Sequence, residues 1–127
     1  MSQKSVLLVE DDDAVRGLFA DILRAAGFSV RSIPLAAQTF DALRVSTPDV
    51  IVLDLGMPRG SLQGTEVLAQ LREDEVWRDI PVIIVSGLVD LLNPDVARRL
   101  GVKAILAKPL ISLDELITAI RRIDVGA

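Results

Sequence analysis

The chain has 127 residues, of which 50% are apolar, and its 14 basic and 18 acidic side chains give a formal net charge of −4. This length suits one domain with a single packed core, spanning residues 1–127. A mean hydropathy of +0.44 could indicate a membrane protein. However, the unbroken apolar runs are only about four residues long, whereas a membrane-spanning helix needs roughly 18, so no transmembrane segment is expected.

Several classes of site are excluded by missing residue types. The chain has no cysteine, which removes disulfides, thiol nucleophiles and thiolate metal sites. It also has no histidine, the usual general base and the commonest ligand of transition metals. A sequence pI near 4.7 argues against binding to nucleic acid, which relies on Lys and Arg. Because acids follow the first apolar run, unlike in a secretory signal, we expect a cytoplasmic protein.

The predicted elements begin with a strand over residues 6–9, a continuous apolar run typical of a strand covered on both faces. An amphipathic helix follows, which Asp12 and Asp13 are suited to cap and Gly27 to end. Alternating apolar and polar residues over 28–33 then predict a half-exposed edge strand.

A weaker helix is expected through Ala36, Phe40 and Leu43, before a strand over 50–54 that is rich in β-branched residues. The glycines and proline of residues 56–64 predict a loop. A third helix follows this loop, and Thr65 is expected to cap it.

The last third of the chain repeats this alternation, with strands predicted over 82–85 and 104–107. Between them, Asn93 and Pro94 indicate the start of a short helix and Gly101 its end. The final helix runs to about Ile123, and it should begin with a capping box formed by Ser112 and Glu115.

Five strands therefore alternate with five helices, which predicts an α/β fold with helices on both faces of a parallel sheet. At this length we expect the flavodoxin-like, doubly wound five-stranded sheet in the order 2-1-3-4-5. In that fold, ligands bind at the carboxyl ends of the strands.

Polar residues directly follow four of the five predicted strands, and they should meet at this edge: Glu10, Asp11, Asp54, Ser86 and Lys108. Clustered carboxylates repel one another unless a cation lies among them. Oxygen ligands without His or Cys favour Mg²⁺, which also binds phosphate. Lys108 and Ser86 could contact phosphate oxygens, and a carboxylate that forms an aspartyl phosphate is the plausible nucleophile.

Each of these residues also has an ordinary interpretation by itself. Glu10 and Asp11 could form a solvated acidic turn, Asp54 an Asx turn, and Ser86 a simple turn, while Lys108 could be a surface lysine. Their joint placement at four strand ends favours a functional site.

The chain resembles the receiver domain of two-component response regulators over nearly its whole length. The resemblance rests on Glu10-Asp11 after the first strand, Asp54-Leu-Gly-Met-Pro58, Ser86-Gly87 and Lys108-Pro109. It implies that Asp54 accepts a phosphoryl group from a phosphohistidine of a sensor histidine kinase or histidine phosphotransfer protein. It further implies Mg²⁺ bound by Asp11, Asp54 and the carbonyl of Gly56, with Glu10 acting through water. Ser86 and Lys108 would then bind the phosphoryl group.

Three features depart from the family pattern. The loop between Pro58 and Gly64 is two residues longer than usual, Ile105 occupies a position that is often aromatic, and Gly87 replaces the usual alanine. In addition, Gly56 and Leu88 occupy positions that influence attack by water in the family. Neither can orient a water molecule, so we expect slow self-dephosphorylation and no turnover enzyme activity.

Alternatives remain open at this point. The chain could be a receiver-like scaffold that binds a partner without phosphorylation, as the long loop and Ile105 would allow. A flavin carrier of the same fold is disfavoured, because the acids after the first strand would repel a phosphate. An aspartate-based phosphatase is disfavoured because Gly56 stands where its second Asp would be.

The apolar fourth-helix side, 88–92 with Ile105 and Ile111, suggests a downstream partner or a homodimer. Neither nucleic acid nor a membrane is expected as a partner, and the chain could be a stand-alone receiver or part of a larger protein.

Overall fold

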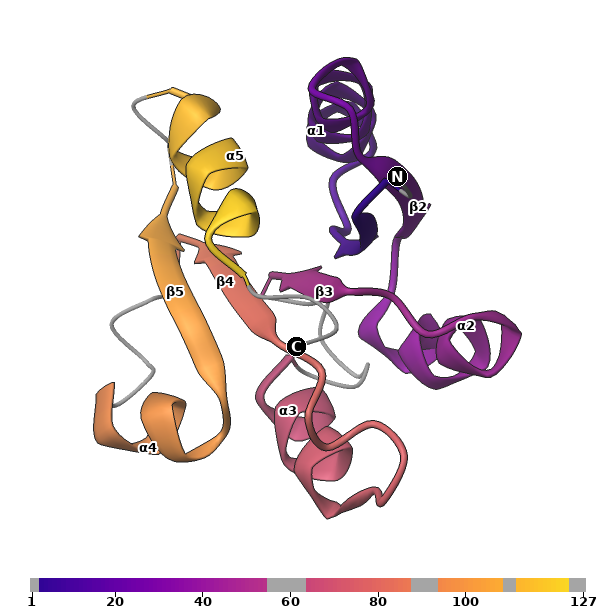
Figure 1. The fold of residues 1–127 in the computed structure, drawn as a ribbon, viewed down its shortest axis with the longest axis vertical. Coiled ribbons are helices and arrows are strands. Elements are labelled where there is room, and N and C mark those ends of the chain that lie inside the picture. Colours follow the sequence, from indigo (N-terminus) through magenta and orange to yellow (C-terminus); the bar gives the residue numbers. More distant parts are fainter. Residues whose placement is uncertain (1–2, 55–63, 88–93, 109–111, 124–127) are drawn as a thin grey trace.

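The structure, a computed structural model, describes residues 3–54, 64–87, 94–108 and 112–123. Five parallel strands form one sheet in the order β2-β1-β3-β4-β5 (Figure 1). The strands are β1 Ser5–Val9, β2 Ser29–Ile33, β3 Val50–Leu53, β4 Val82–Ser86 and β5 Val102–Ala107. The predicted fold class and strand order are therefore confirmed, including β2 as an edge strand.

The described residues also form five α-helices and one 3₁₀ turn, and all but the last helix lie between successive strands. They are α1 Asp13–Ala25, η1 Ala36–Gln38, α2 Thr39–Val45, α3 Gly64–Glu73, α4 Pro94–Arg99 and α5 Asp114–Arg121. Figure 1 shows α1 and α5 together on one side of the sheet, with α2, α3 and α4 on the other. No helix in these described ranges is long and apolar enough to cross a membrane.

The two faces of the sheet build two separate cores. Leu7 and Val9 of β1 pack with residues of α2, α3 and α4, whereas Val6 and Leu8 pack with residues of α1 and α5. All four side chains are at most 1% exposed. Alternate residues of one strand therefore serve opposite faces, which explains the unbroken apolar run.

The ends of the first helix match the prediction. Asp12 is the N-cap of α1, and its carboxylate accepts a hydrogen bond from the backbone N–H of Val15 at 2.9 Å. Gly27 follows the C-cap with a φ of 102°, a conformation that favours glycine. Pro94 begins α4 as expected, and Gly101, with a φ of 74°, follows that helix. Asn93 lies outside the described residues.

Three predicted boundaries were wrong. Thr65 lies inside α3, which begins at Gly64, and is not its cap. The last helix begins at Asp114, so Leu113 and not Ser112 is its N-cap. The Ser112 hydroxyl accepts a hydrogen bond from the backbone N–H of Asp114 at 3.2 Å. Finally, β5 begins at Val102, two residues earlier than predicted.

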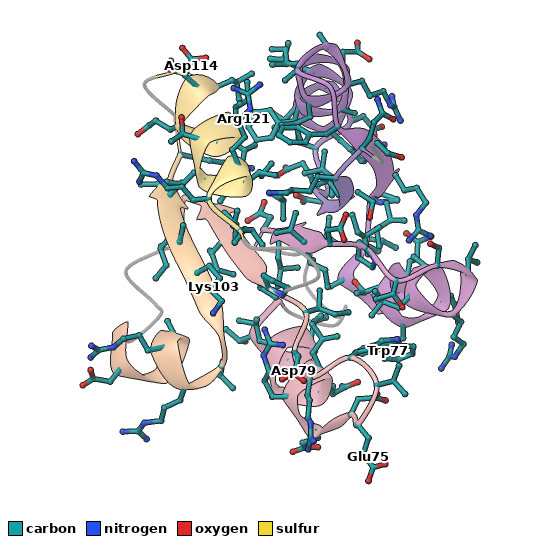
Figure 2. The ribbon with its side chains drawn as sticks, viewed as in Figure 1. Glu75, Trp77, Asp79, Lys103, Asp114 and Arg121 are labelled. Carbon is teal, nitrogen blue, oxygen red and sulfur yellow. The ribbon has the colours of Figure 1, made fainter. Side chains whose placement is uncertain are left out.

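Basic side chains from other elements bind backbone carbonyls where helices end. Lys4, just before β1, donates to the carbonyls of Ile120 and Ile123 at 2.9 and 2.8 Å. Arg31 of β2 donates to the carbonyl of Ala42 in α2 at 2.8 Å. Arg121 lies between α5 and α1 in Figure 2, and it donates to the carbonyl of Ala26 at 3.4 Å. These bonds suit the negative end of a helix dipole.

Candidate functional site

The backbone of the sheet aligns the ends of β1 and β3, the two strands that the predicted acids follow. The N–H of Glu10 donates to the carbonyl of Ile33 at 3.1 Å, and the N–H of Asp54 donates to the carbonyl of Val9 at 3.1 Å. These bonds continue the pairing of β1 with β2 and with β3 by one step beyond the strands. As a result, the acids leave the sheet at one edge, as the sequence predicted.

The structure brings three of the predicted acids together. One carboxylate oxygen each of Glu10, Asp11 and Asp54 lies within 4.8 Å of the others. Glu10 is 2% exposed and Asp54 7% exposed, while Asp11 is half-buried. Negative charges this close and this buried repel one another strongly unless positive charge compensates them.

Lys108, directly after β5, supplies part of that positive charge. Its Nζ donates to Glu10 Oε2 at 2.6 Å and to Asp54 Oδ2 at 3.2 Å. Burial lowers the pKa of Lys108, but the bond to Glu10 and the charge of Asp54 outweigh burial, so the pKa lies above its ordinary value. Lys108 therefore remains an ammonium at the centre of the site at neutral pH.

Glu10 is held by the chain on both of its oxygens. Its Oε1 accepts from the backbone N–H of Asp12 at 3.2 Å, and its Oε2 accepts from Lys108. Burial raises the pKa of Glu10, with a contribution from the neighbouring Asp54, and the bonds from Lys108 and Asp12 offset only part of that shift.

The donor set fits the magnesium ion that the sequence predicted. Three carboxylates without nitrogen or sulfur ligands are the chemistry of a hard cation, and a divalent charge would relieve the repulsion that Lys108 relieves only in part. Glu10, Asp11 and Asp54 are the described residues that could hold it.

The other predicted site residues lie at or beyond the limits of the described chain. Ser86 ends β4, but its side chain lies outside the described part of the structure, as do Gly56 and the loop over 59–63. Of the predicted apolar fourth-helix surface, residues 88–92 and Ile111 also lie outside it, whereas Ile105 is 37% exposed on β5.

Sequence reasoning assigned no role to Arg16, which the structure places against the site. The Arg16 guanidinium donates to the backbone carbonyl of Glu10 at 2.9 Å and to the carboxylate of Asp13 at 2.5 Å. Only the spacing of Asp13 and Arg16, one helical turn apart, was available as a signal in the sequence.

The described part of the chain also has cavities away from the carboxylate cluster. One of about 490 Å³ is lined by Asp79, Lys103, Arg122 and Ile123, among others, beneath the end of α5. The chemistry predicted here needs a surface that a partner protein can reach, so the carboxylate cluster remains the candidate site.

Comparisons with known proteins agree with this geometry. The family model for the response regulator receiver domain matches residues 6–121. The polar-differentiation response regulator DivK of Brucella ovis is 34% identical over 107 residues, covering 84% of this chain and 85% of that protein. The DivK protein of Brucella anthropi is 33% identical over the same shares.

Solved structures show the same likeness. The crystal structure of a sensor protein from Polaromonas sp. JS666 matches with a TM-score of 0.85 and 26% identity, over 96% of each chain. The receiver domain of the Francisella response regulator 1452 matches with a TM-score of 0.83 and 27% identity, over 95% of this chain and 96% of that one. With an acidic cluster and a lysine at the carboxyl edge of a 2-1-3-4-5 sheet, this chain belongs to the family of response regulator receiver domains.

Proposed function

We propose that Asp54 accepts a phosphoryl group from a phosphohistidine of a sensor histidine kinase or histidine phosphotransfer protein, and that the phosphorylated chain binds its partners differently. Receivers of this family interact with such proteins. The observation that carries the proposal is the meeting of Asp54, Glu10 and Asp11 with the ammonium of Lys108 at one edge of the sheet.

In the proposed reaction, a carboxylate oxygen of Asp54 attacks phosphorus and the P–N bond to the partner's imidazole breaks. The imidazole nitrogen keeps the bonding electron pair and takes up a proton, and Asp54 becomes an acyl phosphate.

In this proposal, the ammonium of Lys108 changes its partners when the phosphoryl group is transferred. It is bound to Glu10 and Asp54 in the structure, and after transfer it pairs with the phosphoryl oxygens on Asp54. Ser86, at the end of β4, donates to another phosphoryl oxygen. Asp11, Asp54 and the Gly56 carbonyl would hold Mg²⁺, with Glu10 acting through water. The ion, when bound, neutralises charge on the transferring group.

The proposal includes the partners and the location of the chain. The side of the molecule around β5 and α4, where Ile105 is exposed, is the proposed surface for a downstream partner or a second copy. Neither nucleic acid nor a membrane is a proposed partner, and the proposed location of the reaction is the cytoplasm. Once formed, the acyl phosphate should be lost slowly, as Gly56 and Leu88 predict.

The test is the intact mass of the protein after incubation with acetyl phosphate, with Mg²⁺ or with a chelator. We expect one phosphoryl adduct that requires Mg²⁺ and is absent in Asp54→Asn. Asp41→Asn is the matched control, since Asp41 is an exposed carboxylate on α2, paired with Arg44 outside the carboxylate cluster, and this variant should be phosphorylated like the wild type.

Two results would contradict the proposal. An adduct that persists in Asp54→Asn would place the reaction on another residue. No adduct in a wild-type chain that binds Mg²⁺ in a calorimeter would favour the scaffold that binds a partner without phosphorylation.

A further inference from the structure

We infer that Arg16 is a positioning residue that fixes the acidic turn, residues 10–13, so that Asp11 faces the divalent cation. This inference rests on the proposed function, because it concerns the same metal site. Arg16 lies in the first turns of α1, and its side chain is only 19% exposed, unusually low for an arginine that pairs with an exposed aspartate.

The guanidinium of Arg16 holds the acidic turn at both ends. It donates through one nitrogen to the backbone carbonyl of Glu10 at 2.9 Å and through the other to Asp13 Oδ1 at 2.5 Å. Asp11 lies between these two anchored residues. The planar guanidinium thus restrains the backbone at Glu10 directly and Asp13 through its carboxylate, a pair of fixed bonds that a single ammonium cannot make in the same geometry.

The other bonds of the acidic turn do not hold Asp11 itself. The N–H of Asp12 donates to Glu10 Oε1, and the carboxylate of Asp12 caps α1 through Val15. Within the described residues, no hydrogen bond or ion pair is made by the Asp11 carboxylate, although it lies in the acidic cluster. Its direction is therefore set by the backbone of the turn, and Arg16 restrains that backbone.

Charge and position predict opposite effects of removing Arg16, which makes the inference testable. A positive charge near a cation site repels the cation, so its loss by itself should tighten the binding of Mg²⁺. A group that orients a ligand has the opposite effect, and the loss of such a group typically weakens metal binding by about 10- to 100-fold. In a variant that still folds, weaker binding without Arg16 therefore indicates lost positioning and not lost charge.

The experiment measures the dissociation constant for Mg²⁺ by calorimetry on the whole chain. For Arg16→Met we expect binding weaker by about tenfold, with Arg16→Lys between that variant and the wild type. Arg24→Met is the matched control, because Arg24 is on the same helix and also donates to a backbone carbonyl, that of Val30, at 2.9 Å. It should bind Mg²⁺ like the wild type.

Two further readouts separate positioning from a general loss of structure. In the metal-free protein, the amide protons of Asp12 and Asp13 should exchange faster in Arg16→Met, while those of β1 remain as in the wild type. At saturating Mg²⁺, phosphorylation of Asp54 by acetyl phosphate should return to the wild-type rate, because the variant lacks the placement of the ion and not the nucleophile.

The outcomes distinguish this inference from the proposed function. Equal or tighter Mg²⁺ binding in Arg16→Met, with the wild type binding Mg²⁺, overturns the positioning role and leaves the proposed function intact. A wild-type chain that binds no Mg²⁺ overturns both. If Arg16→Met does not fold by circular dichroism, Arg16→Lys decides, and wild-type affinity in that variant overturns the inference.

Discussion

At the scale of single residues, the site is a balance between buried acids and one lysine. Glu10 holds its proton more tightly in the folded chain than at its ordinary pKa of 4.5, chiefly because it is buried and also because Asp54 is near. A carboxylate with a raised pKa destabilises the fold once it ionises. The stability of the metal-free chain should therefore fall as pH rises from about 4.5 through the raised value of Glu10.

Glu10→Gln removes this ionisation. In the metal-free chain, we expect the free energy of unfolding of the variant, relative to that of the wild type, to increase as pH rises above about 4.5. Urea unfolding with a chelator at a series of pH values measures the difference. Glu75→Gln, at an exposed position, is the control and should give a difference that does not change with pH. A constant difference for Glu10→Gln as well would refute the expectation.

The acids and the lysine could be predicted from the sequence because Glu10, Asp54 and Lys108 directly follow apolar runs and Asp11 comes next to Glu10. A strand end is a local signal, and the fold then brings the strand ends together. Arg16 could not be assigned in this way. Its contact with the Glu10 carbonyl depends on the path of the backbone between β1 and α1. Since every residue has a backbone carbonyl, the residue types in the sequence do not show which carbonyl accepts the bond.

At the scale of elements, Arg72 at the end of α3 joins three segments. Its guanidinium donates to the carbonyl of Leu100 after α4, and to those of Arg78 and Ile80 before β4. Gly101 allows this contact in two ways: it takes a φ of 74°, and a Cβ atom there would lie 2.8 Å from the guanidinium. The corner between α4 and β5 is thus built around the Arg72 side chain.

A double-mutant cycle tests this arrangement. Arg72→Met should destabilise the fold by about 2–4 kcal/mol, since it leaves carbonyls without their charged donor. Gly101→Ala should cost backbone strain of about 1–2 kcal/mol and, in addition, displace the guanidinium. We therefore expect Gly101→Ala to cost less when Arg72 is already Met, by about 1 kcal/mol. Urea unfolding of the four proteins gives these values.

Gly27→Ala is the matched control for this cycle. Gly27 also has a positive φ, of 102°, but nothing lies within 4 Å of a Cβ atom there. Gly27→Ala should lower the free energy of unfolding by the same amount whether residue 72 is Arg or Met. Additive costs for Gly101→Ala would show that the guanidinium moves aside freely.

Element boundaries were less predictable than the elements themselves. The sequence predicts the fifth strand over 104–107, and the exposed Lys103 directly before it interrupts the apolar pattern. In the structure, pairing of Val102 with Val82 across an irregularity in the register extends β5 past this polar residue. Pairing with a neighbouring strand decides such ends, and one sequence does not contain it.

At the scale of the whole molecule, the two layers of helices are tied to the sheet at the edge where strands begin. Lys4 joins the start of β1 to the end of α5, over more than a hundred residues of sequence. Arg31 and Arg72 join α2 and α4 to neighbouring segments. The opposite edge carries the reactive groups, so anchoring and chemistry occupy different ends of the fold.

Lys4→Met should release the end of α5. We expect a loss of about 1–3 kcal/mol in the free energy of unfolding, because the carbonyls of Ile120, Arg121 and Ile123 lose a charged donor. Hydrogen exchange should rise first at the last turn of α5. Arg98→Met, which changes an exposed arginine of α4 that pairs with Asp95 on the same helix, should leave both measurements unchanged. Unaltered exchange in α5 of Lys4→Met would show that the apolar face of that helix alone holds it.

The single tryptophan provides a fluorescence signal from the end of the fold that lies away from the reactive groups. Trp77 contacts Phe40 of α2 at a ring distance of 5.9 Å and packs against the α2, α3 and α4 core, as Figure 2 shows beside α2. It precedes β4, at the edge away from the carboxylates. Its fluorescence should therefore report the unfolding of that layer and should not change when a ligand binds at the carboxylates. Fluorescence unfolding curves taken with and without ligand should then have the same native baseline.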